Sequence, residues 1–459
     1  MEERLLAMAG AHGVDYADVR QTHVERLALE MRDGKLKKAV PGVERGISVR
    51  VIVDGGWGFF STNRIDTEEL KTGLDAAVRM ARASAADMET PVSLAEVPVQ
   101  TANVVWTPEK PPWKVDMEDK ARLLSDMYDA VKARKEIVTV TTSYGEARVR
   151  QRYLSTEGAD IRTEVTRLLA QTHFIAKNDS GMTSRRARIG GTGGFEHFDR
   201  QHPADEAVEA ADATLAALSA PAAPGGKMTV IADPDLTGVF THEAVGHASE
   251  ADLVMAGDSC LEGRLGTQVA NDIVTVVDDS TIPGGYGSFA FDDNGVKGQR
   301  KVLIEGGILR DYMSDRHTAA RLGLEPNGAA RAESYGHRPL VRMSNTFIEA
   351  GDHTFEELLE GVDHGIYAKG TRGGQVDTAK GGFQFSAQEA YLIEDGEIKH
   401  PLRDVSVSGT ILTTLRNIDA LGKDWQLGDP GICGKGQLVP VGDGGPTTRI
   451  RNAIVGGSA

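Results

Sequence analysis

The chain is organised around the stretch Thr241-His242-Glu243-Ala244-Val245-Gly246-His247-Ala248-Ser249-Glu250, which places a His-Glu pair and a second histidine within two helical turns. The short apolar run 228–232 predicts a strand just before it. Asp233-Pro234-Asp235 then supplies an N-cap carboxylate, a proline at the first helical position and an acid that interacts favourably with the helix dipole. The sequence therefore predicts a strand followed by a capped helix that carries both histidines.

The spacing of these histidines differs from the familiar His-Glu-x-x-His zinc motif, because His-Glu-x-x-x-His puts them five residues apart. In a regular helix that spacing separates the two imidazoles by about 140°, against about 40° for a spacing of four. A π-bulge or kink would restore a common face, and Gly246 makes such a distortion less costly. Taken alone, the motif leaves two interpretations open: a metal site, or two unrelated histidines on a capped helix.

Length and composition set the limits of the interpretation. A chain of 459 residues, 40% hydrophobic and 26% charged, predicts about two domains, each with its own core. The charged start Met1-Glu-Glu-Arg-Leu5 predicts no secretory signal, and no apolar run approaches the roughly 20 residues that cross a bilayer. The net charge of −16 argues against a nucleic-acid partner. The only cysteines, Cys260 and Cys433, suit a reducing cytoplasm.

The order of the elements predicts an α+β fold. Hairpins around Asp33-Gly34 and Asp54-Gly55, a capped helix from Asp66 and further helices and strands indicate an N-terminal antiparallel sheet-and-helix domain, residues 1–220. The segment 219–226, rich in proline, glycine and alanine, marks the domain boundary. After the motif helix the pattern becomes mostly β, which predicts a β-rich C-terminal domain over 226–459.

A catalytic zinc normally takes three protein ligands and one water, so the motif requires a third ligand. The candidates are Glu250, Asp252, Cys260, His317 and Cys433. Cys433 lies between glycines, and nearby Lys435 would favour its thiolate form. A lone cysteine is more often a small buried hydrophobic residue, so the residues themselves leave the choice open.

The motif, together with 374–377, 389–396 and Gly431-Ile-Cys433-Gly434-Lys435, resembles the TldD/PmbA family of metallopeptidases, in its TldD branch. The resemblance runs along the whole chain and implies a zinc ion held by His242, His247 and Cys433. It departs from the expected pattern only at 434–437, which is one residue shorter than expected. It also implies a peptide or unfolded polypeptide as substrate, a cytoplasmic setting, and pairing with a PmbA/TldE-like paralogue or with a second copy.

Such a site would work as a zinc hydrolase. Zinc would make its bound water acidic and polarise the scissile carbonyl, and Glu243 would act as the general base. An oxyanion-stabilising residue is not evident, although His317, His337, Tyr335 and Arg338 are candidates.

Two alternatives share these residues. One is a non-catalytic peptide-binding subunit with a structural zinc, completed by Cys260 or Asp252 as a fourth ligand. The other is a metal-dependent amidohydrolase acting on a small molecule. The intact Glu243 and only three strong ligands favour the peptidase.

Overall fold

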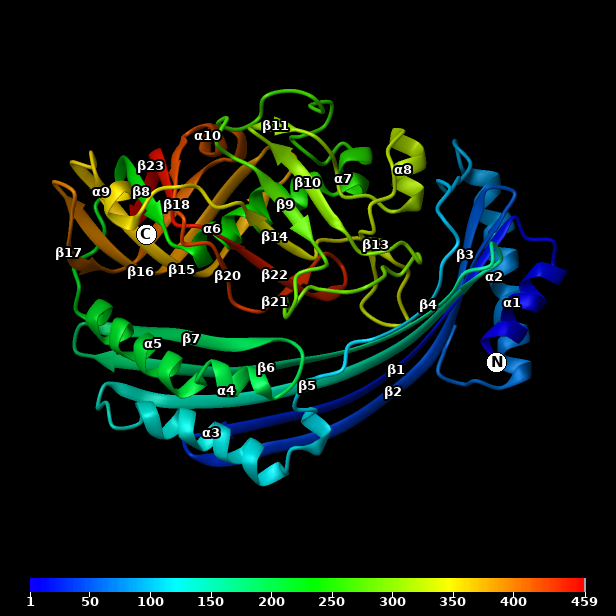
Figure 1. Cartoon of the computed structure of the whole chain (residues 1–459), viewed down its shortest axis with the longest axis horizontal. Helices are drawn as coiled ribbons and strands as arrows, with labels where there is room; N and C mark the ends of the chain where they lie inside the picture. Colours follow the sequence, from blue (N-terminus) through cyan, green and yellow to red (C-terminus); the bar gives the residue numbers. More distant parts are fainter. Residues whose placement is uncertain (458–459) are drawn as a thin grey trace.

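The computed structural model describes residues 1–457 and has two halves, a long curved sheet and a β-rich body that lies against its concave side (Figure 1). This arrangement confirms the predicted α+β class, with an antiparallel N-terminal sheet and a mostly β C-terminal half. No helix among residues 1–457 has both the length and the apolar composition to cross a membrane.

The N-terminal sheet has the strand order β3-β2-β1-β5-β6-β4, and β7 pairs with β6 along the same edge as β4. Its neighbours are antiparallel except for the parallel pair β4–β6. Its strands are β1 (Tyr16–Arg32), β2 (Lys35–Val53), β3 (Gly56–Thr62), β4 (Thr101–Val105), β5 (Ile137–Ser155), β6 (Asp160–Asn178) and β7 (Gly181–Thr192).

The two predicted hairpins are present. Asp33 and Gly34 adopt φ of 49° and 73°, and Asp54 and Gly55 adopt 52° and 77°, which is the left-handed backbone that a tight hairpin turn requires. The strands are longer than the sequence suggested, since β1 and β2 have 17 and 19 residues.

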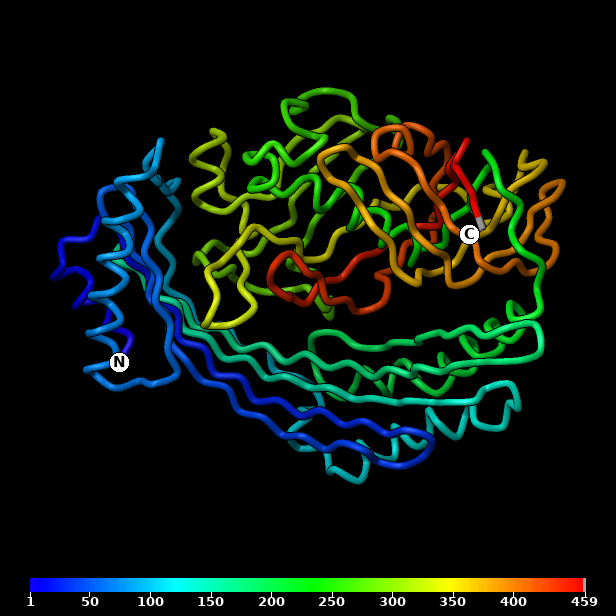
Figure 2. Tube along the Cα trace, turned by 180° about the vertical axis from the view of Figure 1, so that it is seen from behind, coloured from blue at the N-terminus to red at the C-terminus, as the bar shows by residue number. Residues whose placement is uncertain are grey.

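Helices cover the sheet in two places (Figures 1 and 2). The pair α1 and α2 lies at the end that holds β3, and α3, α4 and α5 lie along the convex side. The predicted cap of α2 is confirmed, because the Asp66 carboxylate accepts a hydrogen bond from the Glu69 amide at 2.9 Å. These elements are α1 (Glu2–Ala11), α2 (Thr67–Asp87), the 3-10 turn η1 (Pro112–Lys114), α3 (Met117–Val131), α4 (Glu196–Arg200) and α5 (Pro203–Leu218).

The C-terminal half contains two seven-stranded sheets. In one, the order is β11-β10-β9-β14-β22-β20, with β21 on β22; in the other it is β15-β8-β23-β18-β16-β17, with β19 on β23. Because β15 also pairs with β16, the strands β15, β8, β23, β18 and β16 close into a ring.

The strands of this half are β8 (Gly226–Ala232), β9 (Val276–Asp279), β10 (Arg300–Glu305), β11 (Ile308–Leu309), β12 (Ala330–Arg331), β13 (Leu340–Val341), β14 (Asn345–Ile348), β15 (His364–Asp377), β16 (Gly382–Glu394), β17 (Glu397–Leu402), β18 (Val405–Thr410), β19 (Ile418–Leu421), β20 (Gln426–Leu427), β21 (Gly431–Gly434), β22 (Leu438–Gly445) and β23 (Thr448–Gly457). Its helices are α6 (Pro234–Phe240), the turns η2 (Thr241–Gly246) and η3 (His247–Ser249), α7 (Ala251–Met255), α8 (Arg316–Leu322), α9 (Phe355–Leu359) and α10 (Ile411–Arg416).

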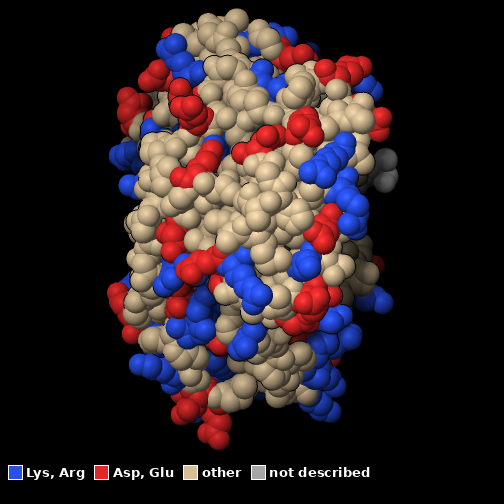
Figure 3. Space-filling view, turned by 90° about the vertical axis from the view of Figure 1, so that its right-hand side faces the viewer, with Lys and Arg blue, Asp and Glu red and all other residues tan. Residues whose placement is uncertain are grey.

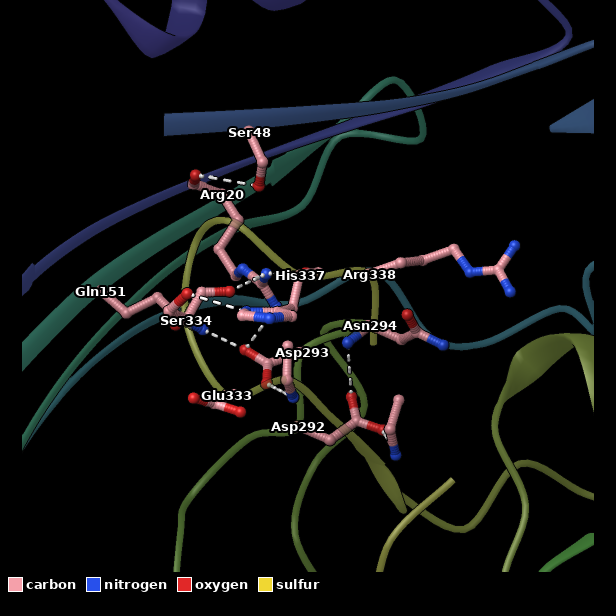
Figure 4. A network of polar contacts seen from close by, with 12 residues as sticks. Arg20, Ser48, Gln151, Asp292, Asp293, Asn294, Glu333, Ser334, His337 and Arg338 are labelled. Carbon is pink, nitrogen blue, oxygen red and sulfur yellow. Dashed lines mark hydrogen bonds and ion pairs between the residues drawn. The ribbon is translucent and has the colours of Figure 1, made fainter. Parts of the chain in front are cut away.

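A polar network joins the two halves where β1 and β5 meet loops of the C-terminal half (Figure 4). The Arg20 guanidinium donates to the carbonyl oxygens of Ser334 and His337 at 2.9 and 2.7 Å, and it pairs with Asp293 at 3.2 Å. Gln151 on β5 donates to the same Asp293 carboxylate at 2.7 Å. Buried charged contacts of this kind fix the position of the sheet against the C-terminal half.

The face of the molecule at the α1–α2 end carries acidic and basic side chains interspersed (Figure 3). On this face the net charge of −16 is therefore not gathered into one large patch of a single sign.

Candidate metal centre

The motif lies at the end of α6, where the helix changes geometry. The Asp233 carboxylate caps α6 by accepting from the Leu236 amide at 2.8 Å, as predicted. After Phe240 the backbone forms a π-helical turn over Thr241–Gly246 and then a 3-10 turn over His247–Ser249. The wider turn accommodates the extra residue of the motif, so the rings of His242 and His247 lie side by side, with centroids 5.3 Å apart and ring planes at 88° to each other. The predicted irregular helix is confirmed.

Gly246 was expected to lower the cost of the helix distortion, but its structural role is different. Its φ and ψ of −56° and −59° are ordinary helical values that any residue adopts. A Cβ at this position, however, would lie 2.0 Å from the Met343 sulfur. Gly246 therefore permits close packing of the motif turn against Met343 and is not needed for an unusual backbone conformation.

Cys433 reaches the histidines from the other side of the site. It lies on the short strand β21, which pairs with β22. Its sulfur is 3.3 Å from His247 Nε2, and donor atoms of Cys433, His242 and His247 all lie within 4.8 Å of one another. His242 and Cys433 are buried and the His247 side chain is 12% exposed. Cys433 follows His247 by 186 positions in the sequence, yet both lie with His242 in one compact set of three metal-type donors.

The protonation states of this cluster suit a cation. Burial raises the pKa of the Cys433 thiol, but hydrogen bonds and charge from the two imidazoles outweigh it and bring the pKa to about 5. Burial lowers the pKa of His247, but Glu250 and Cys433 outweigh it and raise the pKa to about 10. His242 Nδ1 is buried and has no hydrogen-bond partner in the described part of the chain. A thiolate beside imidazoles, one with a buried unpartnered nitrogen, fits a transition-metal ion.

Two of the candidate ligands, Glu250 and Asp252, lie beside the donor cluster and make hydrogen bonds and ion pairs with His247 and Lys435. The fully buried Glu250 carboxylate accepts from His247 Nδ1 at 2.9 Å and pairs with Lys435 at 3.1 Å. Lys435 also donates to both carboxylate oxygens of Asp252 at 2.9 Å. The Glu250 contact orients the His247 ring so that Nε2 faces the thiol, as second-shell carboxylates do in metal sites.

The cluster opens into a cleft of about 470 Å³ between the two halves. Glu243 lines this cleft, its side chain is 33% exposed, and a carboxylate oxygen lies 3.9 Å from His247 Nε2. It is outside the set of three donors. A carboxylate in such a position can exchange a proton with a group that enters the cleft.

The other candidates from the sequence lie elsewhere. The Cys260 amide donates to the Thr378 carbonyl, and its thiol is not among the clustered donors. His317 on α8 contacts the Ser93 carbonyl at 3.2 Å. His337, Tyr335 and Arg338 occupy a loop against the N-terminal sheet and do not line the cleft.

Arginines line the cleft instead: Arg185, Arg186 and Arg188 from β7, and Arg372 from β15. Sequence reasoning missed them. The only signal was the dense run of Arg185-Arg186-x-Arg188, since nothing local shows that this strand lies opposite the motif.

A metal-type cluster in a cleft defines a candidate metalloenzyme, and comparison with known proteins identifies the class. Family models match residues 17–85 (PmbA/TldA metallopeptidase domain 1), 110–218 (central domain) and 225–457 (C-terminal domain). The chain belongs to the PmbA/TldD family of metallopeptidases.

Individual relatives are similar in sequence to this chain along almost its whole length. A metalloprotease of Methanothermobacter thermautotrophicus is 41% identical over 449 residues, covering 97% of this chain and 96% of the relative. A zinc metalloprotease TldD homolog of Saccharolobus solfataricus is 30% identical over 456 residues, covering 97% of each.

Solved structures share the fold. A putative modulator of DNA gyrase from Thermotoga maritima aligns with a TM-score of 0.79 at 22% identity, covering 99% of each chain. TldE from Thermococcus kodakarensis aligns with a TM-score of 0.75 at 18% identity, again covering 99% of each.

Proposed function

We propose that this chain is a zinc-dependent peptidase in which His242, His247 and Cys433 hold the metal and Glu243 is the general base. The observation that carries the proposal is the gathering of these three donors within 4.8 Å beside a partly exposed glutamate in one cleft. Two nitrogens and one thiolate are preferred zinc donors, and three protein ligands leave a position for water.

The chain's own residues have separate roles in this proposal. A zinc ion bound here supplies a Lewis acid that polarises a carbonyl and makes water more acidic. Glu250 holds His247 in one orientation through Nδ1, and Lys435 keeps Glu250 charged. Glu243, in the open cleft, accepts the proton of the attacking water and returns it to the leaving amine.

We propose small or unfolded polypeptides as substrates, cytoplasmic action, and assembly with a PmbA/TldE-like paralogue or as a homodimer. The support is the membership of a metallopeptidase family and the shared fold of TldE from Thermococcus kodakarensis. We also propose residues 1–220 and 226–459 as the two domains of the chain, with the cleft between them.

The alternative is a non-catalytic peptide-binding subunit with a structural zinc. That function needs a closed site with a fourth protein ligand. Within residues 1–457 the donor cluster has three members, and Asp252 is engaged by Lys435. A cluster of only three donors among the described residues favours the peptidase.

The direct experiment is metal removal and replacement with an unstructured peptide as substrate. The chelator-treated chain should lose hydrolysis, and stoichiometric zinc should restore it in proportion to zinc bound. Hydrolysis that persists in metal-free protein would reject the proposal.

A further inference from the structure

The cleft beside the donor cluster contains arginines that the peptidase mechanism does not use. Arg185, Arg186 and Arg188 come from β7 of the N-terminal sheet, and Arg372 comes from β15 of the C-terminal ring. Figure 1 shows β7 at the edge of the sheet nearest the C-terminal half. Both halves therefore contribute guanidinium groups to one cleft.

Three of these arginines make no ion pair within residues 1–457, namely Arg186, Arg188 and Arg372; Arg185 pairs with Glu389. Among the described residues, Arg188 donates only through Nε, to the neutral amide oxygen of Gln171 at 3.0 Å. Its two terminal nitrogens remain available. Arg372 reaches no closer partner than the Gln388 carbonyl, at 3.5 Å.

Arg185 adds a second indication. Its Nε and Nη1 are buried and have no hydrogen-bond partner among the residues that the structure describes. Buried guanidinium nitrogens without acceptors are costly, and such groups in a cleft indicate a missing anionic ligand.

Three carboxyl groups of the same cleft form no ion pair with these arginines within residues 1–457. They belong to Asp235, Asp429 and Asp443, and Asp235 accepts a hydrogen bond from the Asp429 amide at 3.3 Å. Burial raises the pKa of all three carboxyls, that of Asp443 to about 7. A buried carboxyl can keep its proton, whereas a guanidinium cannot release one.

The position of the arginines suits a ligand that extends away from the metal. The three on β7 also line a neighbouring hollow of about 860 Å³, which shares Asp235 and Asp429 with the metal cleft. A chain segment that runs from the metal cleft into this hollow passes the β7 arginines.

We propose that Arg188, with Arg186 and Arg372 in the same cleft, binds a carboxylate of the substrate. Guanidinium groups bind carboxylates through two parallel hydrogen bonds, which gives both affinity and orientation. The carboxylate is either the free carboxyl terminus of the peptide or an acidic side chain at a set distance from the scissile bond. The proposal rests on the proposed function for the identity of the substrate as a peptide.

The test compares the binding of matched peptides to zinc-loaded full-length chain carrying Glu243→Ala, so that turnover does not interfere. One peptide has a free carboxyl terminus, a second is its amide, and two further amides carry an internal Glu or Gln. Loss of charged hydrogen bonds should weaken binding roughly 10- to 100-fold. Either the free acid should bind that much more tightly than its amide, or the Glu peptide more tightly than the Gln peptide.

Arg188→Gln should reduce this preference to within about twofold, and Arg79→Gln, an exposed arginine of α2, should leave it intact. Because the preference is a ratio within one variant, it is independent of the fraction of folded protein. If Arg188→Gln does not fold, Arg188→Lys and Arg372→Gln replace it in the test. Both should lower the preference for the peptide that carries the carboxylate.

Equal binding of all peptides to the Glu243→Ala chain would overturn the proposal. An unchanged preference in the Arg188 and Arg372 variants would overturn it too. Failure of the proposed function is a separate result, because it appears as no hydrolysis of any peptide by the zinc-loaded chain with Glu243 intact.

Discussion

Replacing Glu250 with glutamine should weaken zinc binding although Glu250 is outside the donor cluster. The carboxylate accepts from His247 Nδ1 at 2.9 Å and is fully buried. An amide of the same size removes the charge and weakens that hydrogen bond. Charged hydrogen bonds contribute about 1.5–3 kcal/mol, which corresponds to roughly 10- to 150-fold in affinity. Loss of second-shell partners in metal sites has effects of about 10–100-fold, so the two estimates agree.

The Glu250→Gln substitution should also lower the free energy of unfolding. Burial raises the pKa of Glu250, but Lys435 and His247 outweigh it and hold the pKa below its ordinary value, so the group is charged at neutral pH. The glutamine leaves the buried Arg342, 3.9 Å away, without its carboxylate neighbour. A loss of about 1–3 kcal/mol in the free energy of unfolding is expected.

The assay is competition for zinc against a chromophoric chelator, with chemical denaturation on the same samples. Asp252→Asn is the matched control, because it removes a Lys435 partner that is 31% exposed and does not touch His247. Its zinc affinity should stay within about threefold of the parent. Equal zinc affinity in the Glu250→Gln and parent chains would refute the orienting role of Glu250.

Three further predictions follow from the same geometry. Cys433→Ala should lose bound zinc while Cys260→Ala keeps it, since only Cys433 lies among the donors; equal zinc contents by atomic absorption would exclude Cys433 as a ligand. Zinc affinity should rise with pH between about 6 and 8, roughly tenfold per unit for each proton released, because His247, with its pKa raised to about 10, must lose a proton first. A pH-independent affinity in calorimetry would contradict that protonation state. Gly246→Ala should destabilise the chain by about 1–3 kcal/mol in thermal or chemical unfolding, and adding Met343→Ala should recover part of the loss, because the new Cβ meets the Met343 sulfur at 2.0 Å. No recovery in the double variant would refute the steric explanation.

The features that sequence reasoning predicted correctly depend on neighbouring residues. Asp233 caps α6 because its carboxylate reaches an amide three residues on, and Asp33-Gly34 turns because both adopt positive φ. The distortion near Gly246 followed from helix geometry once both histidines were assigned to one metal, since five residues overshoot one turn. The close packing of Gly246 against Met343 could not be predicted in this way, because Met343 is remote in the sequence.

The features that were missed depend on contacts between distant segments. Spacing could not single out Cys433 over Cys260, and the resemblance to a family supplied that choice. Glu250 was one of several candidate ligands, yet it lies outside the donor cluster and is fully buried against Lys435. The arginines of β7 reach the cleft only because the whole N-terminal sheet lies against the C-terminal half, an arrangement with no local signal.

The central claim is that Glu243 performs proton transfer beside a zinc ion that it does not hold. The measurement is the rate of cleavage of an unstructured peptide by Glu243→Ala, with zinc content determined on the same sample and a PmbA/TldE-like paralogue both present and absent. The account predicts full zinc occupancy with a rate lowered roughly 10²–10⁴-fold, the loss typical of a positioned base. A zinc-loaded Glu243→Ala chain with the parent rate would contradict it.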